Sequence, residues 1–191
     1  MIREKIIADQ CRGKNVLDIG SVGQSDQYCL WTSAYADAKK VTGIDLPDAE
    51  EKSLSIIKFD KNGVKHSRDK RIVRGNMEHY TFEEKFDVIV AGDVIEHVSN
   101  QGLFLDNIHN HLVPSGILIL TTPNAKWPTI TLKPNPTHML WHDKHTLKQL
   151  LERHNFSIRK LFFYEGNKQR YPFLIRLLLL QQQIFVAAEP T

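Results

Sequence analysis

The sequence is poor in cysteine and carries no large excess of charge. Its 191 residues include only two cysteines, Cys11 and Cys29, too few for a disulfide scaffold or a four-cysteine zinc site. The 25 Lys and Arg residues against 22 Asp and Glu leave a formal net charge of +3, which by itself does not indicate nucleic-acid binding. The low cysteine count favours a reducing compartment, and we expect a cytoplasmic protein.

Long apolar runs are equally scarce. The N-terminal sequence Met1-Ile-Arg-Glu-Lys5 lacks the apolar run of a secretion signal, and no stretch reaches the ~18 apolar residues of a membrane-spanning helix. The nearest candidate, residues 173–180, is interrupted by Arg176. We expect one domain over residues 1–191, because a domain has roughly 100–200 residues. The hydrophobic fraction of 41% is that of an ordinary globular protein.

Short apolar runs alternate with longer amphipathic ones, which is typical of an α/β fold with a mainly parallel sheet. Helices are predicted over residues 2–12, 26–38, 99–112 and 144–154, and strands over 15–19, 40–45, 71–74, 86–91, 117–122, 156–164 and 183–188. Residues 48–69 are expected to form an irregular helix around a turn at Asn62-Gly63. The proline-rich loop from Pro123 to His142 is expected to be functional, because structureless loops of this length are uncommon in compact domains.

A turn of small residues follows the first predicted strand, in the stretch Val16-Leu-Asp-Ile-Gly-Ser-Val-Gly-Gln-Ser25. Such a turn lets backbone N–H groups and the start of the next helix approach a polar ligand closely. Asp45 lies 25 residues after Gly20, at the carboxyl end of the next strand, where a carboxylate can accept both hydroxyls of a ribose. The pattern indicates a cofactor that contains adenosine.

The glycines of this turn do not fit a dinucleotide cofactor. Gly20 and Gly23 do not make the G-x-G-x-x-G pattern, and no basic cradle for a pyrophosphate accompanies them. Asp18, directly before the turn, suits a cationic group such as an ammonium or a sulfonium and would repel a pyrophosphate. A nicotinamide-dependent oxidoreductase is therefore the less favoured interpretation.

Further motifs follow the turn in a fixed order over roughly residues 14–165. They are Val16–Gly20, Thr42–Asp45, Val73–Met77, Phe86–Val98, Pro114–Asn124 and His145–Phe156. Together they resemble class I S-adenosylmethionine-dependent methyltransferases, and most closely the small-molecule group that includes ubiquinone-biosynthesis O-methyltransferases. The resemblance implies a Rossmann-like, seven-stranded, mostly parallel sheet with helices on both faces and an antiparallel last strand. The first motif departs from the family pattern at Val22 and Gln24, where glycines are usual, so we expect a different local turn.

The resemblance also implies S-adenosylmethionine as the cofactor and S-adenosylhomocysteine as the product. Asp18 would reach the amino group of the cofactor directly or through water, Gly20 would pack against its methionine part, and Asp45 would bind its ribose. The other implied cofactor-binding residues are Ser21, Gly23 and Leu46 beside these positions, Asn76 and Met77 near the adenine, and Gly92 and Asp93 beneath the sulfonium.

Several of these residues have a simpler structural interpretation. Asp18 can brace the turn, and Asp45 can be a solvated residue at a strand end. His97 is a candidate catalytic base for an acceptor hydroxyl, although a histidine in this place is more often a structural residue that lines the pocket. Glu96 is as well explained by packing at a helix start as by a substrate contact.

Three histidines in the next segment have the spacing of metal ligands on a helix. His138, His142 and His145 fall at i, i+4 and i+7, but the prolines before them disfavour a regular helix. Three-histidine metal sites are rare, so the sequence predicts no metal site. A loop that faces the substrate is favoured instead, with Trp127, Met139 and Trp141 as apolar walls and His142 as a further contact.

The function expected from these observations is methyl transfer to an oxygen, nitrogen or carbon of a small-molecule acceptor. The altered glycine turn keeps one alternative open, a non-catalytic cofactor-binding or partner subunit that retains the fold. Nucleic acid is not expected as a partner, because the sequence has no base-flipping motif of the Asn-Pro-Pro-Tyr type and no basic stripe. Residues 171–180 would form a buried crossover helix or dimer contact, with contact to a membrane surface as the less favoured alternative.

Overall fold

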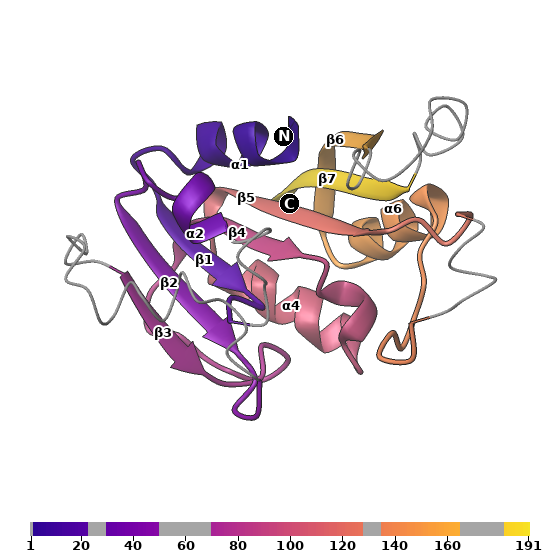
Figure 1. Cartoon of the computed structure of the whole chain (residues 1–191), viewed down its shortest axis with the longest axis horizontal. Coiled ribbons are helices and arrows are strands. Elements are labelled where there is room, and N and C mark those ends of the chain that lie inside the picture. Colours follow the sequence, from indigo (N-terminus) through magenta and orange to yellow (C-terminus); the bar gives the residue numbers. More distant parts are fainter. Residues whose placement is uncertain (1, 23–29, 50–69, 128–134, 165–181) are drawn as a thin grey trace.

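Seven strands form a single twisted sheet in the order β3-β2-β1-β4-β5-β7-β6 (Figure 1). The computed structural model describes residues 2–22, 30–49, 70–127, 135–164 and 182–191. The strands are β1 (Asn15–Ile19), β2 (Lys40–Asp45), β3 (Lys70–Arg74), β4 (Phe86–Gly92), β5 (Leu112–Pro123), β6 (Phe156–Tyr164) and β7 (Gln183–Pro190). The helices are α1 (Ile2–Cys11), α2 (Leu30–Ser33), the 3₁₀ turn η2 (Ile95–His97), α4 (Gln101–His111) and α6 (Lys144–Arg153).

The pairing of the strands confirms the predicted sheet. β1 pairs in parallel with β2 and β4, β2 pairs in parallel with β3, and β4 pairs in parallel with β5. β7 runs antiparallel to both of its neighbours, β5 and β6. The carboxyl ends of β1, β2, β3 and β4 therefore lie at the same edge of the sheet, which is where open α/β sheets bind ligands.

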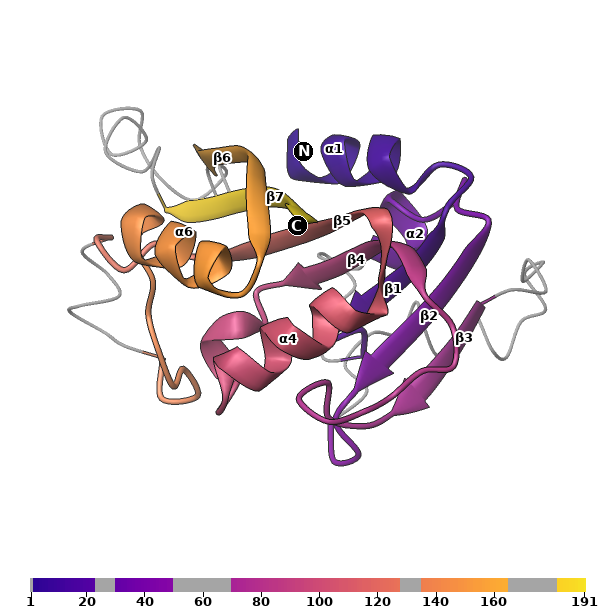
Figure 2. The same cartoon turned by 180° about the vertical axis from the view of Figure 1, so that it is seen from behind.

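Each face of the sheet carries its own apolar core and its own helices (Figures 1 and 2). α4, α6 and η2 pack on one face, and α1 and α2 pack on the other. Side chains along a strand point alternately to the two faces, so Leu17 and Ile19 of β1 lie in the first core and Val16 lies in the second. By the same alternation Asp18 points toward α1 and α2, a direction that matters for the site below.

Two elements differ from the sequence prediction. The helix expected over 26–38 is described only as α2, and it ends at Ser33 because the Tyr35 N–H bonds back five residues to the Leu30 carbonyl and breaks the helical register. β5 begins five residues earlier than predicted, because Leu112 already pairs with Phe86 before an irregularity in the ladder.

Several predicted features lie outside the described residues. They include Gly23, most of the irregular helix expected over 48–69, and the whole of 171–180. In the part of the chain that is described, no helix is both long and apolar enough to cross a membrane. The expectation of a single domain over 1–191 stays a prediction.

Candidate functional site

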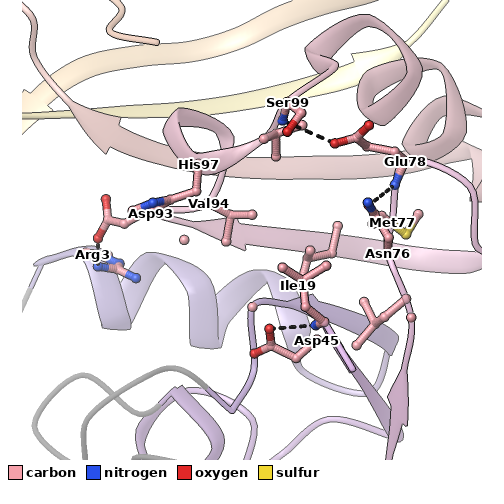
Figure 3. Close-up of a pocket in the computed structure, with 16 residues that line it drawn as sticks. Arg3, Ile19, Asp45, Asn76, Met77, Glu78, Asp93, Val94, His97 and Ser99 are labelled. Atoms are coloured by element: carbon pink, nitrogen blue, oxygen red, sulfur yellow. Dashed lines mark hydrogen bonds and ion pairs between the residues drawn. The ribbon is translucent and has the colours of Figure 1, made fainter. Parts of the chain in front are cut away.

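A cavity of about 580 Å³ opens at the carboxyl edge of the sheet (Figure 3). Its walls come from the ends of β1, β2, β3 and β4, from the segments that follow them, and from the start of α1. The lining residues are Arg3, Ile19, Gly20, Ile44, Asp45, Leu46, Gly75, Asn76, Met77, Glu78, Gly92, Asp93, Val94, His97, Val98 and Ser99. Seven of the ten predicted cofactor-binding residues are in this set, together with His97.

The turn after β1 forms the floor of the cavity at Gly20. Its φ of +75° lies in the left-handed region that favours glycine, and its N–H donates to the Ile44 carbonyl at 2.9 Å. A Cβ placed on Gly20 would come within 2.7 Å of a methyl group of Val94. Both the backbone conformation and the close approach of Val94 therefore require glycine here.

Asp45 ties this turn to the end of β2. One carboxylate oxygen accepts the Val22 N–H at 2.8 Å, and the other accepts the Leu46 N–H at 2.9 Å (Figure 3 shows the second bond). The carboxylate is held from the backbone while it lines the cavity. The carboxylate is thus fixed at the cavity wall, and the ribose contact expected from the sequence stays a prediction.

Asp18 is buried beside the cavity and does not form part of its wall. Its side chain is buried, and its two oxygens accept the Trp31 indole N–H at 2.7 Å and the Tyr35 hydroxyl at 2.8 Å. Burial raises the pKa of this carboxyl to about 7, and the two hydrogen bonds oppose that rise. Asp18 does not line the cavity, so the geometry favours the bracing role over contact with the cofactor.

Ser21, the neighbour of Gly20, is buried as well and lies outside the cavity lining. A Cβ placed on Gly43 would lie 2.6 Å from the Ser21 hydroxyl oxygen, so the Ser21 side chain packs against β2. Direct contact of Asp18 or Ser21 with a cofactor stays a prediction.

The segment after β3 forms a second wall. The Asn76 side-chain oxygen accepts the Glu78 N–H at 2.8 Å, and the Asn76 carbonyl accepts the Tyr80 N–H at 2.8 Å. Asn107 of α4 donates to the Met77 carbonyl at 2.8 Å, which fixes this turn to the helix. Met77 is buried and adds an apolar surface beside the polar Asn76.

The third wall brings together two residues that are 90 positions apart in the sequence. Asp93, directly after β4, has a φ of +56°, and Arg3 of α1 donates to its carboxylate at 3.2 Å (Figure 3). A Cβ on Gly92 would come within 2.6 Å of the Arg3 guanidinium, so glycine lets the cation lie against the strand end. The Arg3 Nε is buried and has no hydrogen-bond partner among the described residues. The Arg3 side chain lines the cavity, where its positive charge favours an anionic group.

His97 lines the far side of the cavity, at the end of η2. Its Nδ1 lies 3.0 Å from the Thr137 carbonyl, which can only accept, so Nδ1 is the donor in this contact. Glu96 beside it is buried and accepts the Thr122 hydroxyl at 2.9 Å. Burial, and to a lesser extent the charge of Asp93, raises the pKa of the Glu96 carboxyl to about 8.

The loop of residues 135–142 is anchored to η2 by hydrogen bonds. The Met139 N–H donates to the Glu96 carbonyl at 2.7 Å, and His142 Nε2 bonds to the Gln101 side-chain oxygen at 3.0 Å. Gln101 in turn donates to the Ile95 carbonyl at 2.7 Å. His142 is buried and anchors the loop through Gln101, and the substrate contact expected of it from the sequence stays a prediction.

The apolar side chains of this region divide into two groups. Met139, Leu140 and Trp141 are exposed, with 58%, 47% and 41% of their surfaces accessible, and Trp127 is buried. None of them lines the described cavity. The substrate contacts predicted for Trp127 and Trp141 stay predictions.

Comparison with known proteins now decides the family. Residues 2–161 match the family described as "Methyltransferase domain". The chain belongs to this methyltransferase family. It is a methyltransferase domain that uses S-adenosylmethionine, with S-adenosylhomocysteine as the product, as the sequence analysis predicted.

Similar proteins are found both by sequence and by fold. A ubiquinone biosynthesis O-methyltransferase of Rhodopseudomonas palustris (strain TIE-1) is 32% identical over 126 residues, which cover 60% of this chain and 47% of that protein. One from Nitrobacter winogradskyi is 39% identical over 56 residues, 29% of this chain and 22% of that protein. The methyltransferase domain thus spans less than half of the length of these relatives.

Solved structures share the fold at low sequence identity. An S-adenosylmethionine-dependent methyltransferase from Mesorhizobium loti superposes with a TM-score of 0.71 at 15% identity, over 98% of this chain and 96% of that chain. The N-methyltransferase NodS from Bradyrhizobium japonicum WM9, in complex with S-adenosylhomocysteine, gives a TM-score of 0.68 at 16% identity, over 99% and 86% of the two chains.

The cavity of the methyltransferase domain suits the charges of its cofactor. The positive charge of Arg3, which lines the cavity, suits a carboxylate, and the oxygens of Asp45 suit the two hydroxyls of a ribose. The sequence analysis did not identify Arg3 as a site residue, although its position on the first helix indicates that it faces the sheet. It lies on the same helical stripe as Ile7 and Cys11, at i, i+4 and i+8, and both of those residues are buried against the sheet.

Proposed function

We propose that the methyltransferase domain transfers a methyl group to a hydroxyl of a small-molecule acceptor that binds beside His97. The observation that carries the proposal is a single cavity lined by Asp45, by Arg3 and by His97, whose Nδ1 lies against the Thr137 carbonyl. The names of the relatives, which are O-methyltransferases, support an oxygen as the methylated atom.

The roles of the residues follow from their contacts. Asp45 would accept the ribose hydroxyls, and Arg3, fixed by Asp93, would pair with the carboxylate of the cofactor. Leu46 and Met77 would supply apolar walls, and Asn76 a polar edge, for the adenine. When bound, the cofactor supplies an electrophilic methyl group on a positively charged sulfur.

The protein contributes alignment rather than covalent chemistry. The walls hold both reactants in one cavity, and this proximity lowers the entropic cost of the reaction. Asp93 would place a negative charge beside the reacting centre, because it lines the cavity next to Gly92. Proton removal by His97 Nε2 is one route to an ionised hydroxyl, and it stays a prediction.

Transfer of an isotope-labelled methyl group to a panel of acceptors tests the proposal. The panel holds a catechol, an aromatic amine and a compound with an active methylene group, and mass spectrometry locates the label. We expect label on the catechol oxygen. Label on nitrogen or carbon alone would contradict a hydroxyl acceptor. Cofactor binding without label on any compound would favour the non-catalytic subunit that the altered glycine turn left open.

A further inference from the structure

Two charged side chains of the cavity indicate where each part of the cofactor would lie. Arg3 lies at one end, Asn76 lies at the other, and Asp45 lies between them (Figure 3). The strand order gives the same arrangement, because Asp93, the partner of Arg3, follows β4, Asp45 ends β2 and Asn76 follows β3. With the carboxylate of the cofactor at Arg3 and its ribose at Asp45, the base would reach Asn76.

The side-chain amide of Asn76 is oriented by its own backbone. Its oxygen accepts the Glu78 N–H at 2.8 Å, a bond that asparagine often makes to the residue two positions along a turn. Because a backbone N–H can only donate, this contact distinguishes the oxygen of the amide from its nitrogen. The nitrogen has no partner among the described residues, and Asn76 lines the cavity, so its two N–H groups are available to a ligand.

The turn that carries Asn76 is fixed from several directions. The Asn76 carbonyl accepts the Tyr80 N–H at 2.8 Å, and Asn107 of α4 donates to the Tyr80 carbonyl at 2.9 Å. Glu78, which also lines the cavity, accepts the Ser99 N–H at 3.2 Å and thereby joins the turn to the segment after η2. A rotation of the amide that presented its oxygen to the cavity would break the bond to Glu78. The cavity therefore meets the base with a hydrogen-bond donor.

A donor at this place does not select adenine by its amino group. Hypoxanthine, the base of inosine, carries a carbonyl oxygen where adenine carries that amino group. The N–H groups of Asn76 can donate to a ring nitrogen of adenine or to the carbonyl oxygen of hypoxanthine, but they cannot accept from an amino group. A carboxylate would do the reverse, because it accepts from the amino group and repels the carbonyl oxygen.

We propose that Asn76 sets the base specificity of the cofactor site, and that the site accepts a cofactor with hypoxanthine in place of adenine. The inference deepens the proposed function and rests on it for the positions of the carboxylate and the ribose. It assigns Asn76 a defined task, donation to the base, and it names a second class of ligand for the same cavity.

Calorimetric titration with S-adenosylhomocysteine and S-inosylhomocysteine, which differ only in the base, tests the proposal without any turnover. For the unaltered chain we expect dissociation constants within about threefold of each other. Asn76→Asp keeps an oxygen for the Glu78 N–H and replaces the free donor by an acceptor, so it should bind S-inosylhomocysteine about tenfold or more weakly than S-adenosylhomocysteine. Asn110→Asp, at an exposed residue of α4 outside the cavity lining, adds the same charge and should keep the ratio of the unaltered chain.

A second variant serves in case the aspartate disturbs the turn. Asn76→Ser keeps a hydroxyl oxygen for the Glu78 N–H but has no amide, so both compounds should lose affinity by the same several-fold factor. Loss of affinity for only one of them would contradict donation by Asn76 to both bases.

The outcomes separate this inference from the proposed function. An unaltered chain that binds S-adenosylhomocysteine but prefers it over S-inosylhomocysteine by about tenfold or more would overturn the inference alone. The same ratio of affinities in the unaltered chain and in Asn76→Asp would overturn it too, because another group would then select the base. A folded chain that binds neither compound would contradict both the inference and the cofactor placement of the proposed function.

Discussion

The two sides of the cavity are held in place in different ways. On the cofactor side, the ends of β1 and β2 are joined by backbone groups, such as the Gly20 N–H on the Ile44 carbonyl, and by Asp45, which accepts two backbone N–H groups. On the acceptor side, the Met139 N–H bonds to the Glu96 carbonyl, and the other bonds that hold η2 and the loop involve the side chains of Gln101, His142 and His97. The cofactor side therefore follows from the sheet itself, whereas the acceptor side depends on individual residues that can vary without altering the fold.

A side chain at Gly20 should disrupt the cofactor side most strongly. Gly20→Ala combines a left-handed φ with a contact of 2.7 Å to Val94, and we expect a loss of ~2–4 kcal/mol in the free energy of unfolding and of most cofactor affinity. Gly13→Ala is the matched control, because Gly13 has a φ of +68° with nothing within 4 Å of its Cβ position. It should cost only ~1 kcal/mol and leave the affinity intact. Urea unfolding and calorimetry measure both, and equal losses in the two variants would contradict the close approach of Val94.

Removal of the cation at Arg3 should have the next largest effect. Arg3→Met keeps much of the apolar stem but deprives both Asp93 and the cofactor carboxylate of their partner, so affinity for S-adenosylhomocysteine should fall about tenfold or more. Arg12→Met, at an arginine with 67% of its side chain exposed on the loop after α1, should leave affinity unchanged. If the two variants bind alike, Arg3 is only a structural partner of Asp93.

Asp18 should make the stability of the cofactor side depend on pH. Its folded pKa of about 7 lies above its ordinary value, so this carboxyl stabilises the fold below about pH 4 and loses that contribution as the pH rises to about 7. Asp18→Asn removes the titration. The unfolding free energy of the unaltered chain relative to this variant should therefore be ~1–3 kcal/mol more favourable at pH 5 than at pH 8. Asp37→Asn, at a largely exposed carboxylate, should show no such change. If the difference in unfolding free energy between the unaltered chain and Asp18→Asn did not change with pH, the raised pKa of Asp18 would be contradicted.

Loss of His142 should affect the acceptor side while sparing the cofactor side. His142→Ala breaks the bond to Gln101 that anchors the loop, so the KM for the acceptor should rise several-fold while affinity for S-adenosylhomocysteine stays unchanged. His142→Asn, which keeps a donor in this place, should recover part of the loss. An unchanged KM in His142→Ala would show that the loop does not position the acceptor.

The same contrast explains which parts of the site could be predicted from the sequence. Gly20 and Asp45 were found because Gly20 directly follows β1 and Asp45 is the last residue of β2, and the register of a parallel sheet brings such strand ends together. Arg3 was missed because its partner is 90 residues away, and only the helical stripe with Ile7 and Cys11 marked its direction. The sequence analysis considered His138, His142 and His145 at helical spacing, but residues 135–142 form a loop, in which side chains have no regular spacing. The true neighbours of His138 could therefore not be predicted from its position in the chain.

Binding of S-adenosylhomocysteine, measured by calorimetry, tests the central claim most directly. The account predicts one saturable site for S-adenosylhomocysteine and no binding of NAD. Affinity should be at least tenfold weaker in Asp45→Ala, because that change removes the oxygens proposed to bind the ribose and leaves the Val22 N–H without its acceptor. Asp48→Ala, at an exposed aspartate three residues away, should bind like the unaltered chain. A folded chain that binds no S-adenosylhomocysteine, or that binds it equally well without the Asp45 carboxylate, would contradict the account.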